Sequence, residues 1–369
     1  MRLKNSLLIL AISIAGLWDA APTALAQGET AQVVNTRLET RAAGPSLMAT
    51  MNEIAASADS PIWIGYDVAA VPGEHGDCCG NYRDGMNRGA KGVWYLEKEH
   101  GSDGERAHSQ NELKLEGEGT LRILYRADKK HVGRIRIMSN QCQLDAGGLR
   151  LVWLKDVKSE ESIAYLGKFV QGFDNSGGDE DRIGEQALTA IALHADPAAD
   201  VALARFSSPG QPEELRKRAS FWMGAARGAA GLAQLETMAK TDPSSEVRAQ
   251  VTFALFVSKE PGATEAIIRM AREDGSPHVR GQALFWLAQK AGAKAATAIS
   301  GAITNDPDTE VKKRAVFALS QMPKDEGVPK LIEVAQNNKN PEVRKQAMFW
   351  LGQSGDPRAL EFFEKVLRN

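Results

Sequence analysis

Apolar residues in the C-terminal half of the chain recur with a period of 32 residues. One set consists of Phe221, Phe253, Phe285, Phe317 and Phe349, and a second set consists of Leu235, Ile267, Ile299, Leu331 and Phe363. Within each period the apolar positions lie three or four residues apart, as they do on one face of a helix. Pro, Gly or Asp separates the two apolar segments. The pattern predicts two short helices per period, stacked from about residue 181 to the C-terminus.

The second predicted helix of each period has a core of the form Val-Arg-x-x-Ala-x-x-x-Leu. Its copies begin at Val247-Arg248, Val279-Arg280, Val311-Lys312 and Val343-Arg344. In these residues the C-terminal half resembles the HEAT-repeat family, specifically the short bacterial form called phycobilisome-lyase-like HEAT. The resemblance implies an α-solenoid of about six helix pairs over residues 181–369, in which each unit buries its apolar face against its neighbours.

Residues 61–173 have a different pattern, because β-branched and aromatic residues are frequent there and alternate with polar ones, as in strands. Strands are predicted at 62–66, 92–96, 120–125, 133–138 and 149–154. The third and fourth form a predicted hairpin with one apolar face and one basic face. Ser159 is expected to cap a helix from 160 to 171. The predicted fold is therefore mainly α, with a HEAT-like α-solenoid preceded by a small α+β or mostly-β module.

The N-terminal residues have the features of a signal peptide over residues 1–26. Arg2 and Lys4 precede an apolar run, and Ala24-Leu25-Ala26 fits a cleavage site. We therefore expect an exported protein, periplasmic or secreted, with no membrane span after cleavage. Residues 27–60 are expected to form a polar tether and one short helix from Ser46 to Ala58.

The overall charge is close to balanced, with a formal net charge of -2 and a pI of about 6.4. A nucleic-acid binder usually has a clear basic excess, so this balance does not favour one. A protein partner fits the repeat architecture better, although the sequence does not identify it.

Three cysteines fall in or near the predicted strands, at Cys78, Cys79 and Cys142. In an oxidising compartment a disulfide is expected from Cys78 or Cys79 to Cys142, leaving one thiol. The alternative is a thiol- or metal-dependent sensor or enzyme in which His75 joins these cysteines as a ligand.

Sequence signatures of catalysis are missing. The six histidines are scattered and form no H-E-x-x-H pattern. A G-x-S-x-G elbow, a phosphate loop and the His-Glu pairs of HEAT-type metal hydroxylases are also absent from the sequence. We therefore expect no enzyme activity, no catalytic residues and no cofactor.

The phenylalanines of the second helices fall on the side opposite the aliphatic core, because each lies about 160° around the helix from the centre of that core face. Polar residues flank them three positions before and four after. The candidate partner-binding residues, expected on the concave side of the solenoid, are Gln250, Phe253, Gln282, Phe285, Gln289, Arg314, Phe317, Gln321, Gln346, Phe349 and Gln353. The alternative is that the rings only pack between adjacent helices.

Two further sets of repeated residues have structural interpretations. The Arg/Lys position after each core valine is expected to pair with Asp242, Asp274 and Asp306 in the turns between helices. The tryptophans on alternate repeats, at Trp222, Trp286 and Trp350, are expected to be large core residues.

Overall fold

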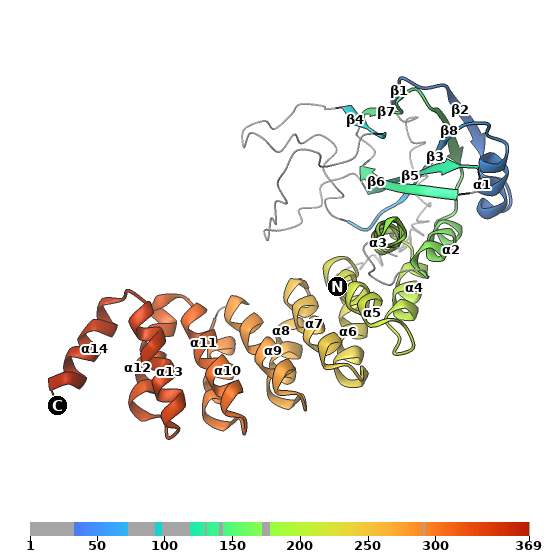
Figure 1. Cartoon of the computed structure of the whole chain (residues 1–369). Helices are drawn as coiled ribbons and strands as arrows, with labels where there is room; N and C mark the ends of the chain where they lie inside the picture. Colours follow the sequence, from blue (N-terminus) through green and yellow to red (C-terminus); the bar gives the residue numbers. More distant parts are fainter. Residues whose placement is uncertain are drawn as a thin grey trace, which may run out of the picture. The chain divides into compact units, whose positions relative to one another are not determined.

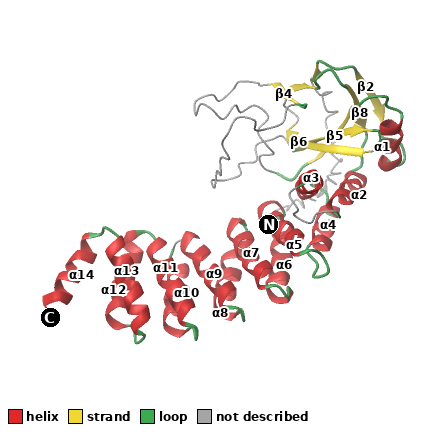
Figure 2. Ribbon diagram, in the orientation of Figure 1, coloured by secondary structure: helices red, strands yellow, loops and turns green. Residues whose placement is uncertain are grey.

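The computed structural model describes residues 33–72, 93–97, 119–129, 131–139, 143–171, 178–290 and 292–368. Its strands belong to the first part of this range and its helices mostly to the second (Figures 1 and 2). None of the helices in the described residues is long and apolar enough to cross a membrane. The predicted signal peptide, His75 and the three cysteines lie outside the described residues.

The main sheet has five strands in the order β2-β8-β3-β5-β6. Their bounds are Leu38–Ala42 for β2, Ile62–Ala69 for β3, Thr120–Asp128 for β5, His131–Ser139 for β6 and Arg150–Lys155 for β8. Strand β8 pairs in parallel with β2 and β3, whereas β3, β5 and β6 pair antiparallel. The predicted hairpin is therefore confirmed, and it occupies one edge of the sheet.

A smaller sheet with the order β1-β7-β4 comprises Val33–Val34, Gln143–Asp145 and Val93–Tyr95, respectively. Strands β1 and β2 lie in the segment that was predicted to be a polar tether, and that prediction is wrong. Strand β2 is an edge strand with the sequence Leu-Glu-Thr-Arg-Ala, and most of its side chains are exposed. An edge strand with little buried surface lacks the apolar alternation by which strands are recognised in a sequence.

The face of the β5–β6 hairpin that was predicted to be basic does carry arginines, but both faces are buried over most of β5. Arg122 on β5 is only 1% exposed. Its Nε and Nη2 atoms donate to the carboxylate of Asp67 at 3.0 Å each, and its guanidinium lies 4.9 Å from the ring of Trp153. The ion pair and the ring together allow an arginine to occupy a buried position.

The opposite face of the main sheet packs against helices α1 (Leu47–Ala56) and α2 (Ser159–Val170), and α3 (Asp179–Leu193) contacts β6. Ser46 caps α1, as its side chain accepts from the Ala49 amide. Ser159 does not cap α2, because it is the first helical residue and Lys158 occupies the N-cap. Glu160 and Glu161 in the first turn complement the helix dipole instead.

The remaining helices run from Ala198 to Arg368. Their bounds are Ala198–Phe206 (α4), Glu213–Ala226 (α5), Gly228–Thr241 (α6), Ser245–Val257 (α7), Ala263–Glu273 (α8), Pro277–Lys290 (α9), Ala293–Asn305 (α10), Thr309–Gln321 (α11), Lys324–Asn337 (α12), Pro341–Gln353 (α13) and Pro357–Arg368 (α14). From α6 onward they form consecutive hairpins, followed by α14, in which α7, α9, α11 and α13 are the second helices. The prediction of two helices in each 32-residue period is therefore confirmed.

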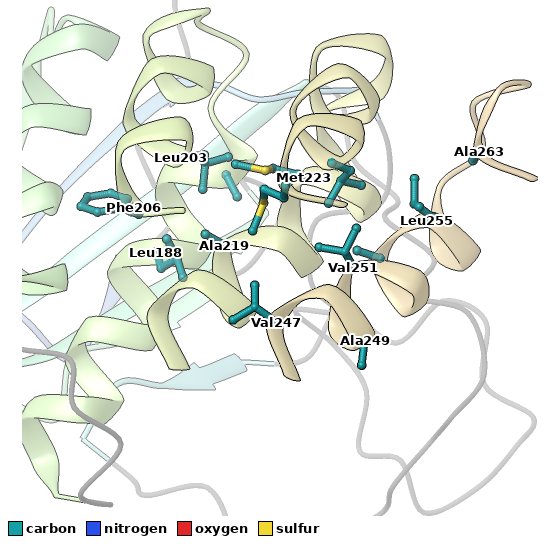
Figure 3. Close-up of a cluster of buried hydrophobic side chains, with 14 of the residues drawn as sticks. Leu188, Leu203, Phe206, Ala219, Met223, Val247, Ala249, Val251, Leu255 and Ala263 are labelled. Carbon is teal, nitrogen blue, oxygen red and sulfur yellow. The ribbon is translucent and has the colours of Figure 1, made fainter. Parts of the chain in front are cut away.

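The core valines take equivalent places in these hairpins. Val247, Val279, Val311 and Val343 each lie near the start of a second helix and are at most 1% exposed. Figure 3 shows Val247 and Leu255 of α7 in one apolar cluster with Met223 of α5. This cluster continues through the described helices and includes residues of α1, α2, α3 and the main sheet. The helical array therefore shares its hydrophobic core with the sheet-containing module.

Candidate functional site

The second helices present a repeated surface of aromatic and amide side chains. Helix α5 precedes α7, α9, α11 and α13 in this row and is counted with them as a second helix, and consecutive helices of the row pack against one another. We call their exposed or half-buried phenylalanines, with the polar residues three before and four after, the Phe/Gln face. All eleven predicted binding residues from Gln250 to Gln353 are exposed or half-buried, and none is in the core. The structure thus brings the predicted residues together on one row of helices.

The phenylalanine rings of this face pack in pairs between adjacent helices. Phe221 stacks on Phe253 with the ring centroids 6.0 Å apart, and Phe285 stacks on Phe317 at 6.3 Å. Phe349 is 53% exposed. Four of the rings therefore make inter-repeat contacts while each remains only half-buried, so the packing role is real and the rings still reach the surface.

The tryptophans join these pairs into a longer aromatic ladder, which the sequence did not predict. Trp286 lies 4.7 Å from Phe253 and 4.8 Å from Phe256 of the preceding second helix. Trp350 lies 5.0 Å from Phe317 in the same way. The tryptophans are half-buried, so the expectation that they are core residues is wrong. The rings of Trp286 and Trp350 extend toward the preceding repeat, and Trp222 packs on Phe221 of its own helix.

The glutamine amides of the Phe/Gln face have few partners within the protein. Gln321 donates to the hydroxyl of Ser320 at 3.1 Å. Across the described part of the chain, no hydrogen bond joins the side chains of Gln250, Gln282, Gln289, Gln346 or Gln353 to another residue. An amide carries both donors and an acceptor, so each of these groups is available to a peptide backbone.

The arginines that follow the first core residue of the second helices form a ladder of ion pairs with aspartates in the turns, as predicted. Arg216 pairs with Asp242 at 2.8 Å, Arg248 with Asp274 at 2.8 Å, and Arg280 with Asp306 at 2.7 Å. The hydrogen bond to Asp306 raises the pKa of the Arg280 guanidinium, and Asp274 does the same for Arg248. At the next rung Lys312 and Asn338 replace both partners, and Lys312 donates instead to the Thr304 carbonyl at 3.1 Å. The ladder therefore has a structural role, because each arginine is paired with an aspartate of the next turn.

A buried polar chain was missed by the sequence analysis because its residues are far apart in the sequence. It joins Tyr125, Tyr66, Ser162 and His194 through contacts of 2.7, 2.8 and 2.9 Å. His194 Nδ1 lies 2.6 Å from the Ala190 carbonyl, and burial lowers the pKa of the imidazole to about 4.

The direction of each proton in this chain follows from the carbonyl at its end. A carbonyl only accepts, so Nδ1 of neutral His194 donates to Ala190, and Nε2 accepts from the Ser162 hydroxyl. Ser162 then accepts from Tyr66, which accepts from Tyr125. Ser162 and His194 are both fully buried, so this Ser–His pair has no access for a substrate and serves the fold.

No group of three or more His, Cys, Asp or Glu side chains in the described residues has the arrangement of a metal site. The disulfide from Cys78 or Cys79 to Cys142 and the alternative site with His75 involve residues outside the described ranges. Both stay predictions.

Comparison with known proteins gives one family match, in the last part of the array. The HEAT repeats family matches residues 298–369. A search of curated proteins finds no significant match.

Several solved structures resemble the chain distantly. Human deoxyhypusine hydroxylase is 16% identical over 56% of this chain and 90% of its own, with a TM-score of 0.26. The complex of CpcE and CpcF of phycocyanin lyase from Nostoc sp. PCC7120 is 21% identical over 42% of this chain and 99% of its own, with a TM-score of 0.32. Kap95p, solved with RanGDP, is 17% identical over 58% of this chain and 33% of its own, with a TM-score of 0.39. Likeness at this distance carries no inference about activity.

The family match covers α11 to α14 together with most of α10, and the same hairpin geometry continues upstream of it. Equivalent buried valines begin the second helices on both sides of residue 298. Residues 298–369 therefore match the HEAT repeats family, and the C-terminal half of the chain is a helical repeat array like those of HEAT solenoids.

Proposed function

We propose that this chain is a protein-interaction scaffold that binds an extended segment of a partner along the Phe/Gln face, on the concave side of the array. The observation that carries the proposal is the repeated placement of unpartnered glutamine amides beside half-exposed aromatic rings. Amides suit the peptide backbone, and the rings suit apolar side chains.

The spacing of the rings also suits an extended ligand. Within the stacked pairs the centroids are 6.0 and 6.3 Å apart. Alternate side chains of an extended strand point to the same side and are about 6.8 Å apart. A strand running across the second helices therefore offers successive same-side residues to the two rings of a pair.

A selection from a library of linear peptides tests this function. We expect the wild-type protein to enrich binders, and the double variant Phe349→Ala/Gln321→Ala to lose them. Both residues are exposed, so the fold should be kept. The matched control is Val201→Ala/Leu360→Ala, which removes apolar side chains that are 73% and 63% exposed on α4 and α14. The proposal fails if no binders are enriched, or if the two double variants bind them equally.

A location outside the cytoplasm is part of the same proposal and depends on the N-terminal segment. If the predicted cleavage occurs after Ala26, N-terminal sequencing of the protein from its natural source will begin at Gln27. A mature protein that begins at Met1 contradicts export through this segment.

A further inference from the structure

The second helices segregate their charges along their length. Acidic residues occur only in their first turns, at Glu213, Glu214, Glu246, Glu310 and Glu342. From Lys217 in α5, and from the corresponding position in α7, α9, α11 and α13, no Asp or Glu follows to the end of the helix. The first helices α8 and α12 differ, since they carry acidic and basic residues along their length, whereas the first helix α10 has no Asp or Glu. The Phe/Gln face is thus bordered by carboxylates but contains none.

Cations without carboxylate partners lie in this face, at Arg314, or beside it, at Lys345 next to Gln346 and Lys290 next to Gln289. Arg314 of α11 and Lys345 of α13 are exposed, and neither forms an ion pair with any residue of the described ranges. Lys290 at the end of α9 lies 5.5 Å from the Phe256 ring and donates to the Ser258 carbonyl. Lys313 differs from these three, because Glu310 neutralises it at 3.0 Å.

The position of Arg314 depends on a glycine in the preceding second helix. A Cβ atom added at Gly281 would lie 2.5 Å from the Arg314 Cδ atom, so the arginine side chain passes directly over α9 at this point. The equivalent positions of α7 and α11 hold Ala249 and Lys313. Gly281 therefore leaves room for a guanidinium between two consecutive second helices.

The aromatic rings, like the unpaired cations, favour a negatively charged ligand. The rings of Phe285 and Phe317 are nearly parallel, with an interplanar angle of 7° and centroids 6.3 Å apart, so the pair is offset rather than face to face. Their edges remain to meet a ligand, and the edge of an aromatic ring carries positive partial charge.

We propose that the partner segment bound by the Phe/Gln face is acidic, with carboxylates placed against Arg314 and Lys345 between its apolar side chains. This inference rests on the proposed scaffold function and adds the charge of the ligand. Complementary charge should speed association and select against basic segments.

Three labelled peptides test the inference by fluorescence anisotropy. They share the same phenylalanine and leucine positions and carry Glu, Gln or Lys at all the others. We expect the Glu peptide to bind most tightly, and Arg314→Glu/Lys345→Glu to weaken its binding by about tenfold or more. The milder Arg314→Gln/Lys345→Gln should give an intermediate loss. Added salt should weaken the Glu peptide more than the Gln peptide.

The control variant is Lys339→Glu/Lys365→Glu, which changes the net charge equally at exposed positions off the second helices. Its affinity for the Glu peptide should stay within about twofold of wild type, because those charges lie outside the face. Circular dichroism confirms that each variant is folded.

The outcomes separate this inference from the function on which it rests. If the Gln or Lys peptide binds as tightly as the Glu peptide and still needs Phe349 and Gln321, the scaffold stands and its acid selectivity is wrong. If the two charge-reversal variants bind the Glu peptide equally, or no peptide binds, the inference is overturned, and the library selection decides separately on the scaffold. Preferential binding of an oligothymidylate overturns both.

Discussion

At the scale of single residues, the buried chain from Tyr125 to His194 shows how a polar group is tolerated in a core. Every hydroxyl and ring nitrogen of the chain has a partner, and the neutral imidazole fits because its two nitrogens have opposite roles. Sequence could not reveal this arrangement, because its members come from β5, β3, α2 and the end of α3. A charged imidazole would have to donate from both nitrogens and would reverse the chain.

We expect stability to fall as the pH drops through the range in which His194 is protonated only in the unfolded chain. Its folded pKa, about 4, lies below the ordinary value of 6.5, so the unfolded state binds the extra proton first. The folded state therefore loses up to about 3 kcal/mol between pH 6.5 and pH 4. Urea unfolding across this range measures the loss, and His194→Gln should flatten it. An unchanged pH slope in the variant would assign the loss to other groups.

The stacked rings give a second residue-level prediction. Phe317→Ser removes a ring held between Phe285 and Trp350 and should cost about 1–3 kcal/mol of unfolding free energy. Phe349→Ser removes a ring that is 53% exposed and should cost less than about 1 kcal/mol. Denaturant midpoints measured by circular dichroism compare the two variants. Equal costs would mean that stacking between repeats contributes little.

At the scale of elements, periodicity predicted the helices far better than the strands. Second helices were predictable because Val247 and its equivalents recur at one place in each helix, and the Asp242 turn was predictable because Asp-Pro begins a helix. Strands β1, β2 and β7 were not, since they are short or lie at an edge and bury few side chains. The burial of the hairpin's basic face was not predictable either. An arginine such as Arg122 is usually exposed, and here it is buried because it pairs with Asp67.

The ion-pair ladder supplies the prediction for this scale. The side chains of Arg280 and Asp306 are 9% and 5% exposed, respectively. Asp306→Asn leaves a buried guanidinium without its charge partner and should cost about 3 kcal/mol. Thermal or urea unfolding measures the cost, and Asn338→Gln in the rung without a carboxylate is the control with a small expected effect. A cost for Asp306→Asn below about 1 kcal/mol would show that the pair is effectively solvated.

At the scale of the whole molecule, the candidate face was predictable as a set of residues and not as a geometry. The positions that a helix period brings together, from Gln250 to Gln353, do lie on one row of helices. Sequence could not show the pairing of the rings or the place of the tryptophans, because both depend on how neighbouring helices approach each other. The positive charge of the face was also not predictable, because a sequence does not show whether Arg314 has a carboxylate partner.

Stability along the array should follow from nearest-neighbour contacts. Helix α14 leaves Leu360 and Leu367 exposed at 63% and 86%, whereas Ile303 and Ala335, which correspond to Leu367 in α10 and α12, are at most 2% exposed. We therefore expect α14 to open first, and its amides to exchange hydrogen faster than those of α9 or α11. Hydrogen exchange with mass spectrometry measures this order. Uniform protection across these helices would contradict it.

Tryptophan occurs in every second repeat of the aromatic ladder, and this spacing determines how many repeats can be removed or added without losing its ring contacts. Excising one hairpin so that α7 meets α11 would put Ala318 in the place of Trp286 and so discard the ring that packs next to Phe253. Excising two would bring Trp350 to that space. The protein should therefore be lengthened or shortened by two hairpins at a time, because the aromatic ladder repeats every two hairpins and not every one.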